Sequence, residues 1–182
     1  MTLLQAFLLG ILQGITEFLP ISSSGHLLMA QSLFGLNDLV ALKSFDIAVH
    51  FGTLLAILIY FRKDFWNLIK GFLGKIFSLG KKVSAENEAN FNLAITLILA
   101  TIPAILAGLF LEEWLDSYFY NAVTVPIMLV VVGVVFLVAE KIYKKNGKAR
   151  TEITRKEGLG IGLAQTLALI PGVSRSGSTI TA

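Results

Sequence analysis

Residues 13–26 read Gln13-Gly-Ile-Thr-Glu17-Phe-Leu-Pro20-Ile-Ser-Ser-Ser-Gly-His26, a polar stretch inside apolar sequence. Polar and charged groups at membrane depth are energetically costly and mark functional sites. Pro20 ends the helical pattern of the preceding residues. The apolar run at 27–36 is too short to cross about 30 Å of hydrocarbon at about 1.5 Å per residue. Residues 1–36 are therefore predicted to form a re-entrant hairpin, which enters the membrane and returns on the same side.

The composition indicates an integral membrane protein. The chain has 182 residues, of which 55% are hydrophobic and 15% charged, whereas a soluble domain carries about 25% charged residues. It contains no cysteine, which excludes disulfide and thiol chemistry. The formal charge of +3 is too small to indicate nucleic-acid binding.

Three further apolar runs predict transmembrane spans, at residues 45–61, 91–111 and 123–139. Residues 65–79 mix apolar side chains with lysines, a pattern typical of an amphipathic helix at the interface. We expect polar loops at residues 81–90, 112–122 and 140–157. Residues 158–182 are predicted to begin a second re-entrant hairpin. Since the sequence ends inside an expected helix start, we interpret it as a fragment that lacks a C-terminal part.

The basic residues predict the orientation of these segments. Residues 62–82 and 140–157 hold 13 of the 15 lysines and arginines, and the 112–122 loop holds none. The positive-inside rule puts the two basic regions in the cytoplasm and 112–122 outside. The first hairpin is then expected to open to the outside, and the segment from residue 158 to enter from the cytoplasm.

A weak internal repeat aligns residues 9–28 with residues 161–180 at an offset of 152. The identical pairs are Gly10 and Gly162, Gln13 and Gln165, Ser22 and Ser174, Ser24 and Ser176, and Gly25 and Gly177. The two copies have opposite predicted orientations, which indicates an inverted repeat with a binding site at its interface. The predicted fold is thus an all-α polytopic membrane protein with re-entrant hairpins in an inverted repeat. We expect Glu17, His26 and Arg175 to meet near mid-membrane.

Gln13 and Glu17 are four residues apart and share one helix face. In a structural role, Gln13 would bond across helices and Glu17 would form an ion pair with a buried arginine. In a functional role, Glu17 would handle a proton or help to bind a divalent cation. Carboxylate and amide oxygens suit Mg²⁺ or Ca²⁺, with Glu17 and Gln13 as ligands. His50 lies four residues after Asp46, and we interpret this pair as structural rather than catalytic.

Two serine-rich turns are candidate phosphate sites. Ser22 and its neighbours would cap the helix that begins near His26, and the same geometry cradles an anion. The second turn, from Ser174 to Thr179, contains Arg175, whose planar donor fork suits phosphate oxygens. His26 would be a buried core histidine, a general base or a nucleophile. Together these groups indicate phosphoryl chemistry on a lipid-borne phosphate.

In the two motifs, Gln13–His26 and Pro171–Thr179, and through the whole chain, the sequence resembles the bacitracin-resistance family of undecaprenyl-diphosphate phosphatases. The resemblance implies hydrolysis of undecaprenyl diphosphate to the monophosphate carrier of cell-wall synthesis. It also implies a divalent cation, a multi-pass protein of the bacterial plasma membrane, an active site reached from the outer face, and a homodimer. Family members contain re-entrant helix pairs in inverted repeats.

The resemblance also implies a set of functional residues. By motif position these are Gln13, Glu17, Ser22, Ser23, His26, Ser174, Arg175, Ser176 and Thr179. The first motif position is often Glu in the family, and here Gln13 removes one carboxylate. Attack on phosphorus by His26, attack by Ser23, and activation of water by His26 all remain open.

Two other functions are compatible with these features. Inverted repeats, broken helices and mid-membrane charges are also typical of transporters, including a polyprenyl-phosphate translocase. A non-catalytic scaffold would instead tolerate apolar replacements at Ser23, His26 and Arg175. Phosphate release in detergent, without two compartments, separates a hydrolase from a carrier.

Overall fold

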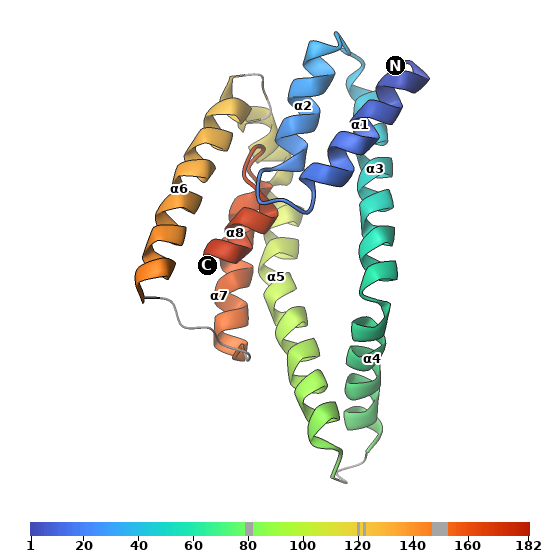
Figure 1. The fold of residues 1–182 in the computed structure, drawn as a ribbon, viewed down its shortest axis with the longest axis vertical. Coiled ribbons are helices and arrows are strands. Elements are labelled where there is room, and N and C mark those ends of the chain that lie inside the picture. Colours follow the sequence, from blue (N-terminus) through green and yellow to red (C-terminus); the bar gives the residue numbers. More distant parts are fainter. Residues whose placement is uncertain (79–81, 120, 122, 147–152) are drawn as a thin grey trace.

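The computed structural model describes residues 1–78, 82–119, 121, 123–146 and 153–182. All regular structure in these ranges is helical, which confirms the all-α prediction (Figure 1). The elements are α1 (Leu3–Thr16), α2 (Ser23–Leu33), α3 (Leu39–Tyr60), α4 (Arg62–Phe77), α5 (Ala85–Phe119), α6 (Thr124–Asn146), α7 (Arg155–Gln165), the 3₁₀ helix η1 (Thr166–Leu169) and α8 (Arg175–Thr181).

Three helices in the described ranges are long and apolar enough to cross a membrane, and they cover all three predicted spans. They are Leu39–Tyr60, Ala85–Leu111 and Thr124–Lys145. The first begins at Leu39 rather than at residue 45, because the Asp38 carboxylate accepts a hydrogen bond from the Ala41 backbone N–H at 3.1 Å. This N-cap starts the helix before the apolar run itself begins.

The predicted loop at 81–90 is wrong from Ala85 onward, where α5 begins. Ser84 accepts a hydrogen bond from the Asn87 N–H at 3.3 Å, and Glu86 and Glu88 lie in the first turn. Carboxylates at a helix N-terminus are stabilised by the helix dipole. The polar composition of this stretch therefore reflects a helix start.

The other two predicted loops are also partly helical. Helix α5 continues to Phe119 and α6 continues to Asn146. Lys144 Nζ lies 2.7 Å from Glu140 Oε1, one turn apart, so the charges at the end of α6 pair along the helix. Charged residues that mark the end of an apolar run therefore do not end the helix. Residues 120, 122 and 147–152, and the side chains of Glu112, Glu113 and Asp116, lie outside the described part.

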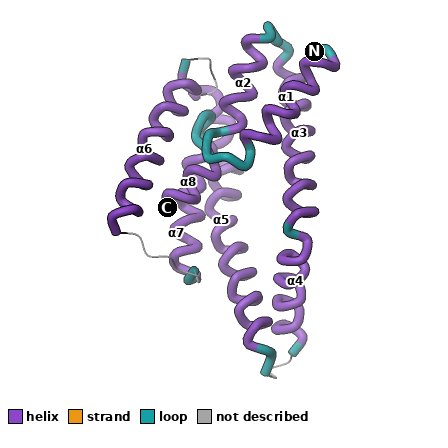
Figure 2. The backbone as a smooth tube through the Cα atoms, in the orientation of Figure 1, coloured by secondary structure: helices purple, strands orange, loops and turns teal. Residues whose placement is uncertain are grey.

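The first predicted hairpin is a pair of antiparallel helices. Helix α1 runs down from the N-terminus and α2 returns beside it, with the turn at residues 17–22 between them (Figure 1). Thr2 and Gln5 form a capping box at the start of α1, with each side chain bonded to the other's backbone N–H. The turn lies level with the loop before α8 (Figure 2).

The segment from residue 154 approaches this turn from the other end of the molecule. Helix α7 begins with a capping box between Thr154 and Glu157. After η1 the chain turns through Gly172, whose φ is +93°, and restarts as α8. A side chain at Gly172 would lie 2.8 Å from the Val125 carbonyl oxygen. This turn therefore requires glycine both for its backbone angle and for its contact with α6.

Small residues set the position of α7 against α5. A Cβ atom at Gly158 would collide with Thr96, and one at Gly162 would collide with the Ala100 backbone. Small residues one turn apart let two helix backbones approach closely in a membrane. This contact holds the second break opposite the first.

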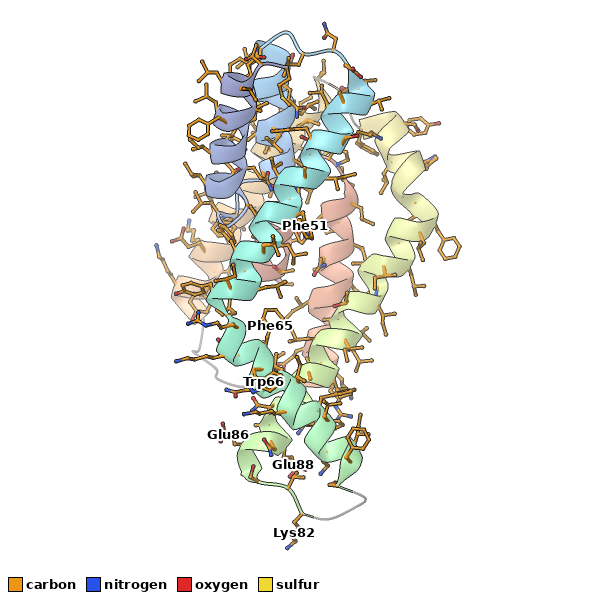
Figure 3. All side chains as sticks on the ribbon, turned by 90° about the vertical axis from the view of Figure 1, so that its right-hand side faces the viewer. Phe51, Phe65, Trp66, Lys82, Glu86 and Glu88 are labelled. Carbon is orange, nitrogen blue, oxygen red and sulfur yellow. The ribbon has the colours of Figure 1, made fainter. Side chains whose placement is uncertain are left out.

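The outer surface agrees with a membrane protein. Phe51 of α3 and Phe65 and Trp66 of α4 project from the helices, and all three are exposed (Figure 3). Lys82, Glu86 and Glu88 gather at the far end, where α4 and α5 approach each other (Figure 3). An exterior of large apolar side chains, with charges at the helix ends, suits contact with lipid.

Candidate active site

A cavity of about 370 Å³ lies between the two helix breaks. Its lining comes from the α1–α2 turn, from α3, and from the segment between η1 and α8. The lining residues are Thr16, Glu17, Leu19, Ser22, Ser23, Ser24, His50, Ala168, Leu169, Pro171, Val173, Ser174, Arg175 and Ser176. Most of the residues predicted from the two motifs therefore share one cavity.

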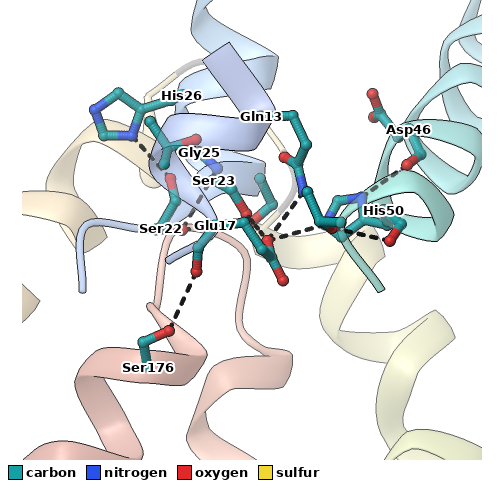
Figure 4. Close-up of polar contacts among 12 residues, drawn as sticks. Gln13, Glu17, Ser22, Ser23, Gly25, His26, Asp46, His50 and Ser176 are labelled. Atoms are coloured by element: carbon teal, nitrogen blue, oxygen red, sulfur yellow. Dashed lines mark hydrogen bonds and ion pairs between the residues drawn. The ribbon is translucent and has the colours of Figure 1, made fainter. Parts of the chain in front are cut away.

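Glu17 is the centre of the polar contacts in this cavity (Figure 4). It is the C-cap residue of α1 and its side chain is 19% exposed. Its Oε2 atom accepts a hydrogen bond from Ser23 Oγ at 2.5 Å and one from Gln13 Nε2 at 3.0 Å. A short hydroxyl–carboxylate bond is the arrangement in which a carboxylate can take the hydroxyl proton.

Gln13 is fully buried behind Glu17. Its Nε2 bond to Glu17 confirms that the two residues share one helix face. Its Oε1 atom has no hydrogen-bond partner among the described residues. A buried amide oxygen without a partner costs about 1–3 kcal/mol and asks for an explanation.

His50 reaches the same carboxylate from α3. Its Nε2 atom lies 3.7 Å from Glu17 Oε2. Its Nδ1 atom lies 2.7 Å from the Asp46 carbonyl oxygen, which can only accept. Nδ1 therefore carries the hydrogen, and Nε2 faces the cavity.

The sequence interpretation of His50 as a structural partner of Asp46 missed this contact. Asp46 bonds the imidazole through its backbone oxygen, while its carboxylate accepts a hydrogen bond from Gln31 Nε2 at 2.7 Å. A histidine in the middle of an apolar span is energetically costly, and this cost was the feature of the sequence that could have marked His50 as a site residue. Its pairing with Glu17 depends on how α3 is rotated against α1, which spacing does not reveal.

The second break contributes Ser174, Arg175 and Ser176 to the lining. Ser174 is buried and caps α8, where its hydroxyl accepts the Gly177 N–H at 3.0 Å. Ser176 Oγ donates to the Glu17 carbonyl oxygen at 3.4 Å and so links the two breaks (Figure 4). Within the described chain the Arg175 guanidinium has no hydrogen-bond or ion-pair partner, so its donors are available to an anion in the cavity.

Three predicted site residues are not part of the cavity lining in the described structure, namely Gln13, His26 and Thr179. His26 Nδ1 lies 2.8 Å from the Ser22 carbonyl oxygen, and the ring lies away from Glu17 (Figure 4). The Thr179 hydroxyl lies 3.1 Å from the Arg175 carbonyl oxygen and 3.2 Å from that of Ser176. Of the three residues expected to meet, the structure brings Glu17 and Arg175 to one cavity and leaves His26 outside it.

Ser22 combines two features at the start of α2. Its hydroxyl accepts the Gly25 N–H at 3.4 Å, as expected for the cap of that helix. Its φ is +63°, in the left-handed region that costs most residues about 1–2 kcal/mol. The turn thus holds a strained serine in the cavity wall, a feature that concentrates at functional sites.

The donors around Glu17 fit a divalent cation. Two side chains lie close to the Glu17 carboxylate. Gln13 Nε2 lies 3.0 Å from Glu17 Oε2, and His50 Nε2 lies 3.7 Å from the same oxygen. No group of three or more His, Cys, Asp or Glu side chains occurs among the residues searched. A cation here would therefore be held by mixed donors.

Comparison with known proteins gives one consistent result. The family model described as "Bacitracin resistance protein BacA" matches residues 6–182. The chain is 44% identical over 179 residues to an undecaprenyl-diphosphatase of Rubrobacter xylanophilus, and 42% identical over 181 residues to one of Hahella chejuensis. These alignments cover 98% and 100% of the chain but 64% of each relative. The chain thus spans slightly less than two thirds of the length of these relatives.

Proposed function

The chain belongs to the BacA bacitracin-resistance family, and on that basis we propose that it hydrolyses undecaprenyl diphosphate to undecaprenyl phosphate and phosphate. The relatives named above are undecaprenyl-diphosphatases. The observation that carries the proposal is the 2.5 Å bond from Ser23 Oγ to Glu17, in a cavity that Arg175 also lines. A nucleophile bonded to its base, beside a free guanidinium, suits phosphoryl transfer.

In the proposed reaction Ser23 is the nucleophile. Its Oγ bonds to the terminal phosphorus, its proton passes to Glu17 Oε2, and the bond from phosphorus to the bridging oxygen breaks. The proton on Glu17 then moves to the departing undecaprenyl phosphate. Water attacks the phosphoserine, Glu17 accepts the water proton and returns it to Ser23 Oγ, and phosphate leaves. His26 has no role in these steps because it does not line the described cavity.

Arg175 holds the diphosphate during this reaction. Its fork of donors matches two phosphate oxygens, and the charge that spreads over the equatorial oxygens in the transition state strengthens these bonds. The neighbouring hydroxyls of Ser174 and Ser176 line the same cavity and supply further polar contacts to the phosphates. Ser22 fixes the turn that presents Ser23.

Glu17, with Gln13 beside it, is the proposed ligand set for the divalent cation that the family resemblance implies. When bound, such an ion offsets negative charge on the phosphates. Glu17 has two carboxylate oxygens, and the contacts with Ser23 and Gln13 described above both use Oε2.

We further propose that the two breaks belong to an inverted repeat of re-entrant hairpins. The offset of 152 that aligns the motifs also aligns the capping box of Thr2 and Gln5 with that of Thr154 and Glu157. It aligns the α2 cap, Ser22, with the α8 cap, Ser174. Together with the basic residues near the lower ends of α4 and α6, this supports a site that opens to the outer face of the plasma membrane.

The test is phosphate release from a long-chain isoprenyl diphosphate by the purified protein in detergent, with and without chelator. We expect release that depends on a divalent cation and falls about 10²–10⁴-fold in Ser23→Ala. Cation-independent binding of the lipid without phosphate release would contradict the proposal and favour a carrier. Wild-type turnover in Ser23→Ala would show that Ser23 is not the nucleophile.

A further inference from the structure

We propose that His50 is a cation ligand, and that its Nε2 atom and the Glu17 carboxylate hold the same divalent ion. The inference rests on the proposed function, because it concerns the cation of that same site. It adds a nitrogen ligand from α3 to a site that the motifs assign to α1 alone. The added nitrogen ligand also affects which class of ion the site prefers.

The tautomer of His50 is the first support. Its Nδ1–H is committed to the Asp46 carbonyl oxygen at 2.7 Å. Metal-binding histidines almost always donate the other ring N–H to a carbonyl or carboxylate, which orients the ring and leaves a lone pair on the binding nitrogen. In His50 that nitrogen is Nε2, the atom that faces Glu17.

The distance between the two groups is the second support. In neutral His50, Nε2 and Glu17 Oε2 are both acceptors, and they face each other at 3.7 Å. A cation between these two acceptors would bind both of them. A tetrahedral ion with ligand bonds of about 2.1 Å would hold its ligands about 3.4 Å apart, so a shift of a few tenths of an ångström completes the site.

Gln13 offers a third donor. Its amide nitrogen lies 3.0 Å from Glu17 Oε2, while its oxygen is buried without a partner in the described structure. A half-turn of the amide exchanges these two atoms and brings the oxygen toward the carboxylate. With a cation bound to Glu17, the turned amide would place its oxygen on the ion.

The imidazole changes the expected ion. Carboxylate, carbonyl and water ligands suit Mg²⁺, Ca²⁺ and Mn²⁺, whereas imidazole favours transition ions such as Zn²⁺ and Fe²⁺. A site with Glu17 and His50 is therefore expected to bind Mn²⁺ or Zn²⁺ more tightly than Mg²⁺ or Ca²⁺. Mn²⁺ accepts both kinds of ligand and can be observed by magnetic resonance, which makes it the probe of choice.

The chain offers a matched control, because it contains two histidines. His26 also has its Nδ1 within 2.8 Å of the carbonyl oxygen four residues earlier, but it does not line the described cavity. His26→Gln removes an imidazole of the same local geometry from outside the site. His50→Gln removes the one that faces Glu17.

The experiment is pulsed electron paramagnetic resonance of Mn²⁺ added to the purified protein in detergent. We expect imidazole nitrogen coupling in the wild type, a changed pattern when histidine is labelled with ¹⁵N, the same coupling in His26→Gln, and none in His50→Gln. Mn²⁺ affinity in His50→Gln should fall by about 10- to 100-fold.

Bound Mn²⁺ without nitrogen coupling in the wild type would overturn the inference, as would coupling that survives in His50→Gln or no Mn²⁺ binding at millimolar concentration. The labelled wild type answers the question even if His50→Gln fails to fold. Cation-dependent phosphate release without nitrogen coupling would refute the role of His50 and leave the proposed function standing. Nitrogen coupling without phosphate release would support the role of His50 as a ligand and refute the proposed function.

Discussion

The two helix breaks of this protein have the same capping pattern but carry different charged residues. Helices α1 and α7 both begin with a threonine capping box, and α2 and α8 both begin with a serine cap bonded to a glycine N–H. At the offset of 152, however, Glu17 corresponds to Leu169, and Ser23 corresponds to Arg175. The first break carries the Glu17 carboxylate and the Ser23 hydroxyl, and the second carries the Arg175 guanidinium.

This difference shows how two similarly capped helix breaks can form an asymmetric cavity. The caps satisfy the backbone groups that a broken helix exposes, which both breaks need equally. The charged groups are not needed for that purpose, so they are free to diverge. Neither break alone carries the proposed base, the proposed nucleophile and the proposed anion-binding group, and all three line one cavity because the breaks meet.

Removing the charge of the second break is expected to have the largest effect. Arg175→Ala should lower phosphate release by about 10³–10⁵-fold, because the guanidinium stabilises charge in the transition state. Arg155→Ala is the matched control, since Arg155 donates to Asn92 Oδ1 at 2.9 Å at the start of α7 and does not line the cavity. Comparable loss in both variants, measured as initial rates, would count against a specific role for Arg175.

Neutralising the first break should have the next largest effect. Glu17→Gln keeps the size of the side chain but removes the proton acceptor for Ser23, so turnover should fall about 10²–10⁴-fold. Glu140→Gln removes a carboxylate from a surface ion pair with Lys144 and should leave turnover unchanged. Equal turnover in Glu17→Gln and wild type would refute the assigned base.

The glycines at equivalent positions of the two segments should respond differently. In Gly162→Ala the new methyl group collides with the Ala100 backbone, so we expect the free energy of unfolding to fall by about 1–3 kcal/mol. Gly10→Ala meets no atom within 4 Å among the described residues and should be neutral or stabilising by up to about 1 kcal/mol. Unfolding in mixed micelles measures both, and equal effects would contradict the close α5–α7 contact.

The two serine caps provide the smallest test. Ser22→Gly loses a cap hydroxyl but relieves a backbone φ of +63°, so its stability should stay within about 0.5 kcal/mol of wild type or rise. Ser174 has an ordinary φ of −72°, so Ser174→Gly gains no such relief and should be the less stable variant. Thermal unfolding that ranks them in the opposite order would show that Ser22 is not strained.

Most of the fold followed from hydrophobic patterns. The three long helices and the second break near Pro171 lie close to where the sequence predicted them. The first break begins earlier than predicted, because α1 ends at Thr16 and not at Pro20. The helix ends were less accurate, because charged residues such as Glu86 and Lys144 extend helices beyond the apolar runs. Charge marks where a segment leaves a membrane, whereas caps decide where a helix begins and ends.

The candidate site followed from sequence only in part. The polar motifs named Glu17, Ser23 and Arg175, which line one cavity. They also named His26, which lies outside that lining, and they passed over His50, which lies within it. His26 follows the serine motif, whereas His50 lies in an apolar span, so the motif pointed to His26 and not to His50.

The class of protein, the helices, their two breaks and the charged groups of each break could be read from the sequence, because each of these depends on residues close together in the chain. Which side chains meet depends on the packing of the helices. A helix turns by about 100° per residue, so a small rotation of α3 decides whether His50 faces Glu17 or the lipid. That rotation is set by packing between distant segments, and the contact between His50 and Glu17 is its consequence.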